Sequence, residues 1–199
     1  MTRLSALGYE LFTPPLSLDF ARWSRPEARS YFEWFIDQIP SRLAELARVE
    51  AAMSEICPLD LLPESLVCLG KTFGSLVETQ PRTQEQLTHA RQELPSTLRP
   101  VVEVEDWELT EEGLSLCVDV GVYFAEVLRK AHPTLRWEPW VRKTVDLNRP
   151  VLVGFRGSVP LDPVRIAINT ALSEAAGEHR PNRLSELFDV WSSKVASTE

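Results

Sequence analysis

The 199-residue sequence lacks the short motifs that identify common catalytic sites. It has no Gly-x-Ser-x-Gly nucleophile motif, no Walker loop, no Gly-x-Gly-x-x-Gly fingerprint and no His-Glu-x-x-His zinc motif. Its three histidines, His89, His132 and His179, are scattered beside polar or turn residues. We therefore expect no cofactor and no metal site, and these absences favour a binding protein over an enzyme.

Cysteines are few and long apolar runs are missing. Cys57, Cys68 and Cys117 form no Cys-x-x-Cys pair and are flanked by apolar residues, which predicts buried free thiols in a reducing compartment. The first ten residues lack the apolar stretch of a secretory signal, and no later stretch qualifies as a membrane anchor. These absences predict a cytoplasmic protein that does not enter a membrane.

Basic residues are in the minority. The chain has 21 Lys and Arg against 29 Asp and Glu, which gives a formal net charge of −8. Nucleic acids and anionic membranes are bound by clustered Lys and Arg, so the charge balance argues against both as partners. A basic protein is the partner class that remains compatible with this charge.

The composition is that of an ordinary globular protein, with 44% hydrophobic and 25% charged residues, and predicts a single domain over residues 1–199. Residues 1–22 carry two adjacent prolines between short apolar runs and are expected to lie extended along the body. Residues 80–96 are mostly polar and bounded by prolines, so we expect an exposed helical arm there.

The stretch Leu109 to His132 is the centre of the predicted fold. It is apolar on nearly every face of a 3.6-residue helix, which is typical of a buried helix. Thr110 is suited to cap its first turn, and Pro133 ends it. The sequence therefore predicts a central buried helix over about 110–131.

The remaining elements predict an α+β fold with a helix-rich N-terminal half, a small, mostly antiparallel sheet around the central helix, and two C-terminal helices. Pro40 is expected to break or kink the first long helical stretch. The expected sheet has three strands, which are placed at 101–105, 135–142 and 150–155. Asp162 and Pro163 are a good N-cap and first-turn pair for the first C-terminal helix.

Asp119, Tyr123 and Glu126 lie on one face of the central helix, at spacings i, i+4 and i+7. Buried carboxylates need partners, and several Arg and Lys residues between 129 and 149 could supply them. One interpretation is structural ion pairing. The alternative is a ligand pocket or active site between the central helix and the sheet, with Arg142 nearby.

An acidic run precedes the central helix. Glu103, Glu105, Asp106 and Glu108 follow one another without an intervening basic residue, and Trp107 lies among them. One interpretation is a solvated face. The other is a face that docks onto a basic partner, with complementary charge that raises the association rate and Trp107 as an aromatic anchor.

Several segments together resemble a family of uncharacterised bacterial proteins. The resemblance covers most of the chain from about residue 27, and Ala125 stands where the family pattern often has a glycine. It rests on Tyr31–Phe35, Trp107–Thr110, Leu116–Leu128, Trp137, Pro150–Phe155 and Leu187–Trp191. The resemblance implies a bacterial cytoplasmic setting and no particular catalytic residues, and a looser similarity extends to small acidic toxin-immunity proteins.

We therefore predict a non-enzymatic protein-binding module, of the toxin-immunity type, that uses its acidic face. The alternative is a small-molecule-binding protein or enzyme with the pocket described above. A homodimer formed through Trp137 or Trp140, which should point to opposite faces of a strand, is compatible with either function.

Overall fold

The computed structural model describes residues 2–53 and 58–196 and shows the predicted α+β class. The helices are α1 (Arg3–Ala6), α2 (Arg25–Met53), α3 (Ser65–Leu76), α4 (Gln84–Glu93), α5 (Glu111–Ala131), α6 (Pro163–Ala175) and α7 (Arg183–Ser192), with short 3-10 turns at Phe20–Arg22 and Arg156–Ser158. The strands are β1 (Thr79–Pro81), β2 (Trp107–Leu109), β3 (Arg136–Pro139) and β4 (Pro150–Val153).

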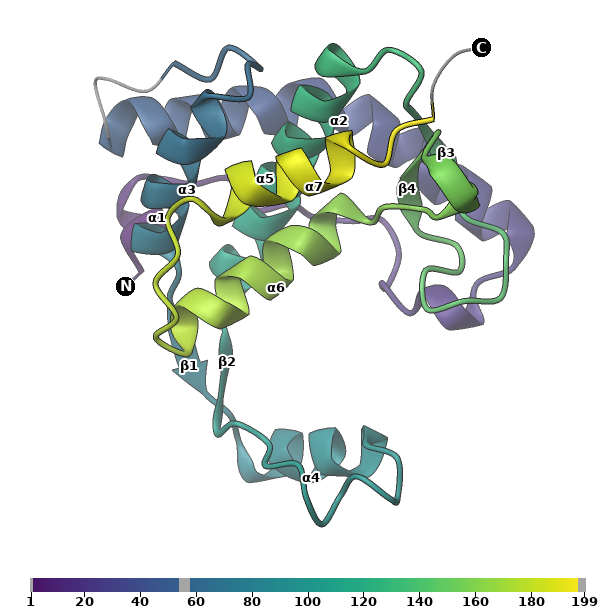
Figure 1. The fold of residues 1–199 in the computed structure, drawn as a ribbon. Helices are drawn as coiled ribbons and strands as arrows, with labels where there is room; N and C mark the ends of the chain where they lie inside the picture. Colours follow the sequence, from purple (N-terminus) through teal and green to yellow (C-terminus); the bar gives the residue numbers. More distant parts are fainter. Residues whose placement is uncertain (1, 54–57, 197–199) are drawn as a thin grey trace.

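Helix α5 is the predicted central helix, and the other long helices surround it (Figure 1). The Thr110 hydroxyl accepts a hydrogen bond from the backbone N–H of Gly113 at 3.1 Å, which caps the helix as the sequence indicated. Phe124, Val127 and Leu128 are completely buried. A helix that is apolar on all sides thus becomes the core against which α2, α3, α6 and α7 pack.

Helix α5 packs closely against the start of α6. A Cβ atom added to Gly121 would lie 2.7 Å from the Cα of Val164 and 2.8 Å from the carbonyl oxygen of Pro163. Real Cβ atoms do not approach other atoms that closely, so only glycine allows this contact. Asp162 caps α6 at the same point by accepting the backbone N–H of Arg165 at 3.0 Å.

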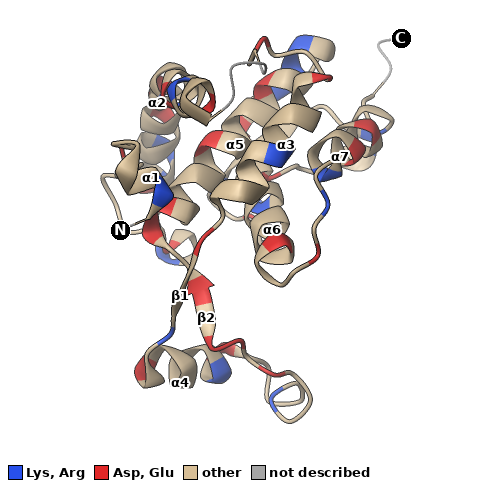
Figure 2. Cartoon of the chain, turned by 90° about the vertical axis from the view of Figure 1, so that its left-hand side faces the viewer, with Lys and Arg blue, Asp and Glu red and all other residues tan. Residues whose placement is uncertain are grey.

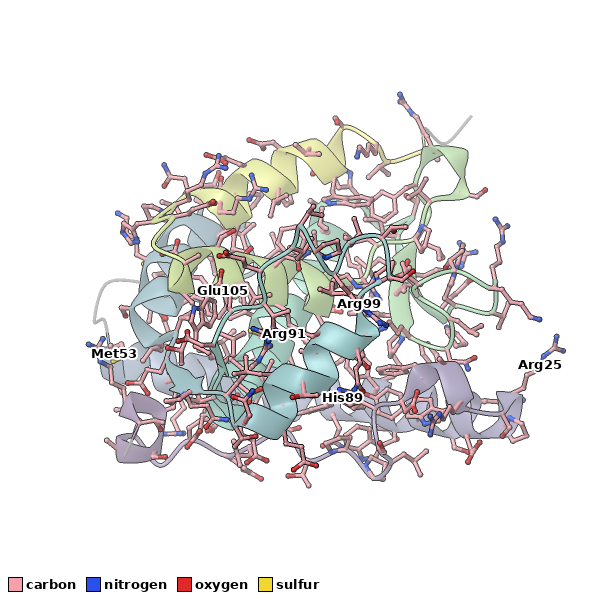
Figure 3. The ribbon with its side chains drawn as sticks, turned by 90° about the horizontal axis from the view of Figure 1, so that it is seen from below. Arg25, Met53, His89, Arg91, Arg99 and Glu105 are labelled. Atoms are coloured by element: carbon pink, nitrogen blue, oxygen red, sulfur yellow. The ribbon has the colours of Figure 1, made fainter. Side chains whose placement is uncertain are left out.

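Helix α2 continues through Pro40, so of the predicted break or kink the break is wrong. One helix runs from Arg25 to Met53, and these two residues mark its opposite ends in Figure 3. Pro40 is exposed, so its ring points to solvent and the helix loses one backbone hydrogen bond there. Phe35 and Ile39 before it and Leu46 after it are all buried, and packing on both sides keeps the two halves in one helix.

The expected three-stranded sheet is wrong in its pairing. The four strands form two separate antiparallel pairs, in which Thr79 lies opposite Leu109 and Arg136 opposite Val153. Residues 101–105 lie outside any strand, and β2 begins only at Trp107. The partner of β2 is β1, a polar segment whose composition gives no strand signal.

The N-terminal segment is extended only in part, because α1 and the 3-10 turn at Phe20–Arg22 interrupt it. It is fixed to the body by side chains from later in the sequence. The Ser115 hydroxyl accepts the backbone N–H of Phe12 at 2.6 Å, and the Asn148 amide donates to the carbonyl of Phe20 at 2.8 Å. Among the described helices, none combines the length and apolar character required to cross a membrane.

Candidate functional site

Residues 79–109, which we call the arm, join the body at the buried residue Leu109 and otherwise project away from it (Figure 1). The stem of the arm is the β1–β2 ribbon, and its far end carries α4. Thr83 and Gln86 form a reciprocal capping box at the start of α4, as their spacing predicts. No residue of α4 is buried. Local capping and the ribbon therefore hold this helix in place, rather than packing against the core.

Glu108 ties the stem to α4. Its Oε1 atom accepts hydrogen bonds from the side-chain amides of Gln80 at 3.1 Å and Gln86 at 2.8 Å. Its Oε2 atom lies 3.4 Å from Nε of Arg82, and the backbone N–H of Arg82 donates to the carbonyl of Asp106 at 2.8 Å. These contacts cross-link the ribbon to the first turn of α4 and thereby fix the orientation of α4 relative to the ribbon.

A groove of about 460 Å³ lies where the base of the arm meets the body. Helices α5 and α6 supply its apolar floor, and the arm supplies polar side chains along one wall. Leu114 and Leu172 are 45% and 39% exposed there, although both belong to helices of the body. The groove is lined by Gln80, Arg82, Glu108, Leu109, Glu111, Leu114, Ile168 and Leu172. It therefore combines an apolar surface with charged walls from two different parts of the chain.

The structure places the five residues of the predicted acidic face on the segment of the arm that returns to the body, and separates them into two sets. Glu103, Glu105 and Asp106 are exposed, whereas Trp107 and Glu108 are half-buried in the stem. Figure 2 shows acidic residues along this returning segment, and Figure 3 labels Glu105 on it. The three outer carboxylates are available to a partner, whereas the Glu108 carboxylate is bound to Gln80, Gln86 and Arg82 within the arm.

Apolar residues lie next to these outer carboxylates in the chain. Val101 is 74% exposed, and Leu98 and Val102 are also exposed. Protein interfaces commonly combine an apolar centre with a charged or polar rim. The arm thus offers two adjacent surfaces, an apolar one at its far end and an acidic one leading back to the groove.

The residues of the alternative pocket are not brought together. Asp119 is completely buried, and its carboxylate is bound by Arg42 through contacts of 2.6 Å from Nε and 2.7 Å from Nη2. The Tyr9 hydroxyl donates a third hydrogen bond to it. Burial raises the pKa of Asp119 to about 6, although the bonds from Arg42 and Tyr9 favour its ionised form.

Tyr123 and Glu126 face other partners. The Tyr123 hydroxyl lies 2.6 Å from the Ser65 hydroxyl and accepts the backbone N–H of Leu61 at 3.0 Å. The Glu126 carboxylate accepts the indole N–H of Trp137 and a guanidinium N–H of Arg129, both at 2.8 Å. Each group thus fixes one neighbouring element to α5.

Arg142 lies on the exposed loop after β3, with its guanidinium carbon 5.1 Å from the centre of the Trp140 ring. The residue that pairs with Asp119 is therefore Arg42, which sequence reasoning missed. A signal existed, because Arg42 occupies a core-facing position in the buried stripe of α2 between Ile39 and Leu46. A charge at such a position requires a buried partner.

The cysteines divide into two kinds. Cys117 is free and buried, as predicted, and burial raises the pKa of its thiol to about 12, so it is protonated and unreactive at neutral pH. Cys68, in contrast, is disulfide-bonded, which corrects the expectation of three free thiols. Cys57 lies outside the described residues. Because Cys68 is disulfide-bonded, the cysteines of this chain do not indicate a reducing compartment.

Within residues 2–53 and 58–196, no cluster of three or more His, Cys, Asp or Glu residues could hold a metal ion. Comparisons with protein-family models, with curated proteins and with solved structures find no match. The resemblance to the bacterial family and to immunity proteins therefore stays a prediction.

Proposed function

We propose that this protein is a non-enzymatic protein-binding module, which takes a segment of a basic partner protein into the groove between the arm and the body. The observation that carries the proposal is the position of α4. This ten-residue helix is held away from the core with no residue buried, and a binding partner would supply the contacts that the body does not.

The groove supports this proposal energetically. Leu114 and Leu172 expose apolar side chains that the fold itself leaves uncovered, and burying apolar surface contributes about 25 cal/mol for each Å² removed from water. Protein interfaces typically have such an apolar centre within a polar rim. Glu108 and Glu111 provide that rim along the groove.

The charge of the arm favours a basic partner. Residues 79–109 contain six acidic side chains and three arginines, a difference of three negative charges. One arginine, Arg82, is already paired with Glu108. Glu103, Glu105 and Asp106 form no ion pair within the described residues, so their field acts on an approaching molecule and raises its association rate. A toxin-immunity role in the bacterial cytoplasm is the specific form of this proposal, and it rests on the resemblance alone.

The test compares capture of partners from the lysate of the protein's own cells by the tagged wild type and by a charge-reversed variant. The variant carries Glu103→Lys, Glu105→Lys and Asp106→Lys, and it leaves Glu108 intact because that residue holds the stem together. We expect a basic protein to be retained by the wild type at low salt, released at moderate salt, and absent from the variant.

A matched control carries the same change in net charge elsewhere. Glu33→Lys, Asp37→Lys and Asp189→Lys reverse three exposed acidic residues on α2 and α7, away from the arm. This control should retain the partner. Equal loss of the partner from both variants would mean that net charge alone drives the association, and retention by the arm variant would overturn the acidic-arm proposal.

A third variant tests the floor of the groove. Leu172→Lys places a charge on an exposed position of α6, so we expect the fold to persist and affinity for the captured partner to fall at least tenfold. Unchanged affinity in calorimetry would show that the partner binds the arm without entering the groove.

A further inference from the structure

A second, more enclosed space lies behind the groove. A cavity of about 210 Å³ is bounded by the N-terminal segment, α2, α5, the start of β4 and α6. Most of its wall is apolar, including Phe12, Phe35 and Val118. Leu114 and Ile168 line both this cavity and the groove, so the two spaces are neighbours.

The wall of the cavity is fixed by a buried asparagine. The Asn148 side chain donates to the carbonyls of Phe20 at 2.8 Å and Trp23 at 3.2 Å, and Asn148 itself adopts a left-handed backbone conformation with φ of 65°. These bonds hold the Phe20 ring at the cavity. The cavity is therefore built by specific long-range contacts rather than left by loose packing.

Three polar side chains, Tyr31, Arg149 and Asp162, complete the lining. The Arg149 guanidinium lies with Cζ 4.5 Å from the centre of the Phe20 ring, and its Nη1 atom is 3.3 Å from Oδ2 of Asp162. That is the single hydrogen bond that Arg149 donates from its side chain within the described residues, although a guanidinium carries five N–H donors. Most of its donors are thus available to a ligand.

The Tyr31 hydroxyl is a second available donor. Tyr31 is only 3% exposed, yet its hydroxyl forms no hydrogen bond with any described residue. Burial raises the pKa of this hydroxyl, so it keeps its proton, and the charges of Arg149 and Asp162 both act on it. The Phe20 ring contacts both side chains, because its centre lies 5.5 Å from that of the Tyr31 ring and 4.5 Å from Cζ of Arg149. Together with the contact between Arg149 and Asp162, this places the three groups side by side at the cavity.

Both carboxylate oxygens of Asp162 already have partners within the protein. Oδ1 of Asp162 accepts the backbone N–H of Arg165 as the cap of α6, and Oδ2 faces both Arg149 and the Arg165 guanidinium, whose Nε is 3.8 Å away. Asp162 therefore orients Arg149 without using all its donors. An entering anion would meet the remaining guanidinium N–H groups and the Tyr31 hydroxyl.

We propose that this cavity binds a small amphipathic monocarboxylate, a medium-chain fatty acid or single-ring aromatic acid, with its carboxylate on Arg149 and Tyr31 and its apolar body among Phe12, Phe35 and Val118. A planar guanidinium binds a carboxylate through paired hydrogen bonds, and the apolar wall takes a hydrocarbon chain or ring. The volume is below the roughly 300–1,000 Å³ typical of sites for drug-sized ligands, which limits the ligand to a smaller body. This site goes beyond protein binding by the arm, and either can fail without the other.

The test titrates the full-length protein with octanoate and, separately, with 1-octanol, which has the same chain without the charge. Calorimetry should show octanoate binding at least tenfold more tightly than octanol, and octanoate should raise the melting temperature. Equal affinity for the two would overturn the role of Arg149. Failure of octanoate and of a single-ring acid, 4-phenylbutyrate, to bind at millimolar concentration would overturn the site itself.

Single substitutions test whether octanoate binds in this cavity. Arg149→Gln should weaken octanoate at least tenfold, and Tyr31→Phe, which keeps the ring, should weaken it severalfold. Arg142→Gln is the matched control, because Arg142 also lies over an aromatic ring but does not line this cavity, and the octanoate affinity of the variant should equal that of the wild type. If Arg149→Gln unfolds the chain, Arg149→Lys retains the charge while losing the paired geometry, and an unchanged affinity in that variant would contradict the proposal.

Discussion

Arg42 and Asp119, 77 positions apart in the chain, form a buried ion pair whose shortest contact is 2.6 Å. Their side chains are 6% and 0% exposed. The same guanidinium also donates to the Tyr9 hydroxyl and to the carbonyl of Glu10, each at 2.9 Å. One pair of charges thus joins α2, α5 and the N-terminal segment at a single point.

Removal of one charge of the Arg42–Asp119 pair should lower the free energy of unfolding more than removal of both charges. Asp119→Asn leaves the Arg42 charge buried without a counter-ion, and we expect a loss of about 3–5 kcal/mol in the free energy of unfolding, measured by urea denaturation. The double variant Arg42→Met with Asp119→Leu should recover a large part of that loss, because no charge remains buried. A double variant as unstable as the single one would show that the geometry of the network, rather than charge, is what stabilises the fold.

Two helical glycines should respond oppositely to alanine. Gly121→Ala places a Cβ against the backbone of α6 and should destabilise the protein by about 1–3 kcal/mol. The nearest neighbour of a Cβ in Gly74→Ala is the flexible side chain of Glu174, 3.2 Å away, so this variant should be neutral or stabilised by up to about 1 kcal/mol through helix propensity. Thermal denaturation of both variants checks this, and a similar loss in both would refute a special role for the contact between α5 and α6.

Glu50 should make stability depend on pH. It is 1% exposed, Thr72 donates to its Oε1 atom at 2.8 Å, and its Oε2 atom is without a hydrogen bond. Burial raises the pKa of Glu50, so the folded state binds the proton more tightly than the unfolded state does. The stabilisation from Glu50 is therefore complete below the unfolded pKa and is lost as pH rises through the folded pKa.

Glu50→Gln isolates this effect, because glutamine keeps the acceptor for Thr72 and carries no charge. We expect the variant to be more stable than the wild type at pH 8 by about 1–3 kcal/mol, the order of cost of an unsatisfied buried polar group. The difference should disappear near pH 4, where Glu50 is protonated. Asp119 and Asp162 also have pKa values raised by burial, and they are present in both proteins, so the comparison at two pH values by urea denaturation cancels their contribution.

Local signals predicted the elements whose cause lies within one or two turns of chain. The Thr110 cap, the apolar faces of α5 and the Asp162–Pro163 start of α6 all lie where the sequence indicated. Each depends on hydrogen bonds or apolar spacing between near neighbours, which the order of residues specifies directly.

Local sequence signals did not predict which distant segments these elements contact. The break at Pro40 was expected because proline removes one backbone donor, but the buried faces on both sides of it decided the outcome. Arg142 and several other basic residues near α5 in sequence were equally available to Asp119, and only the packing of α2 against α5 selected Arg42. The five carboxyl and indole groups of the acidic face were identified and an exposed arm was predicted at 80–96, but not that the acidic face lies on the returning segment of that arm and is separated there into two sets.

The sequence by itself determined the α+β class, the central helix, the two C-terminal helices and the negative charge, because composition and short-range spacing encode them. Tertiary structure alone decided that Asp119 is neutralised by Arg42, that residues 97–109 belong to the same arm as the exposed segment predicted at 80–96, and that Tyr31 and Arg149 meet at a cavity. The physical reason is that each of these depends on segments far apart in the chain, whose side chains acquire their surroundings only when the helices pack around α5.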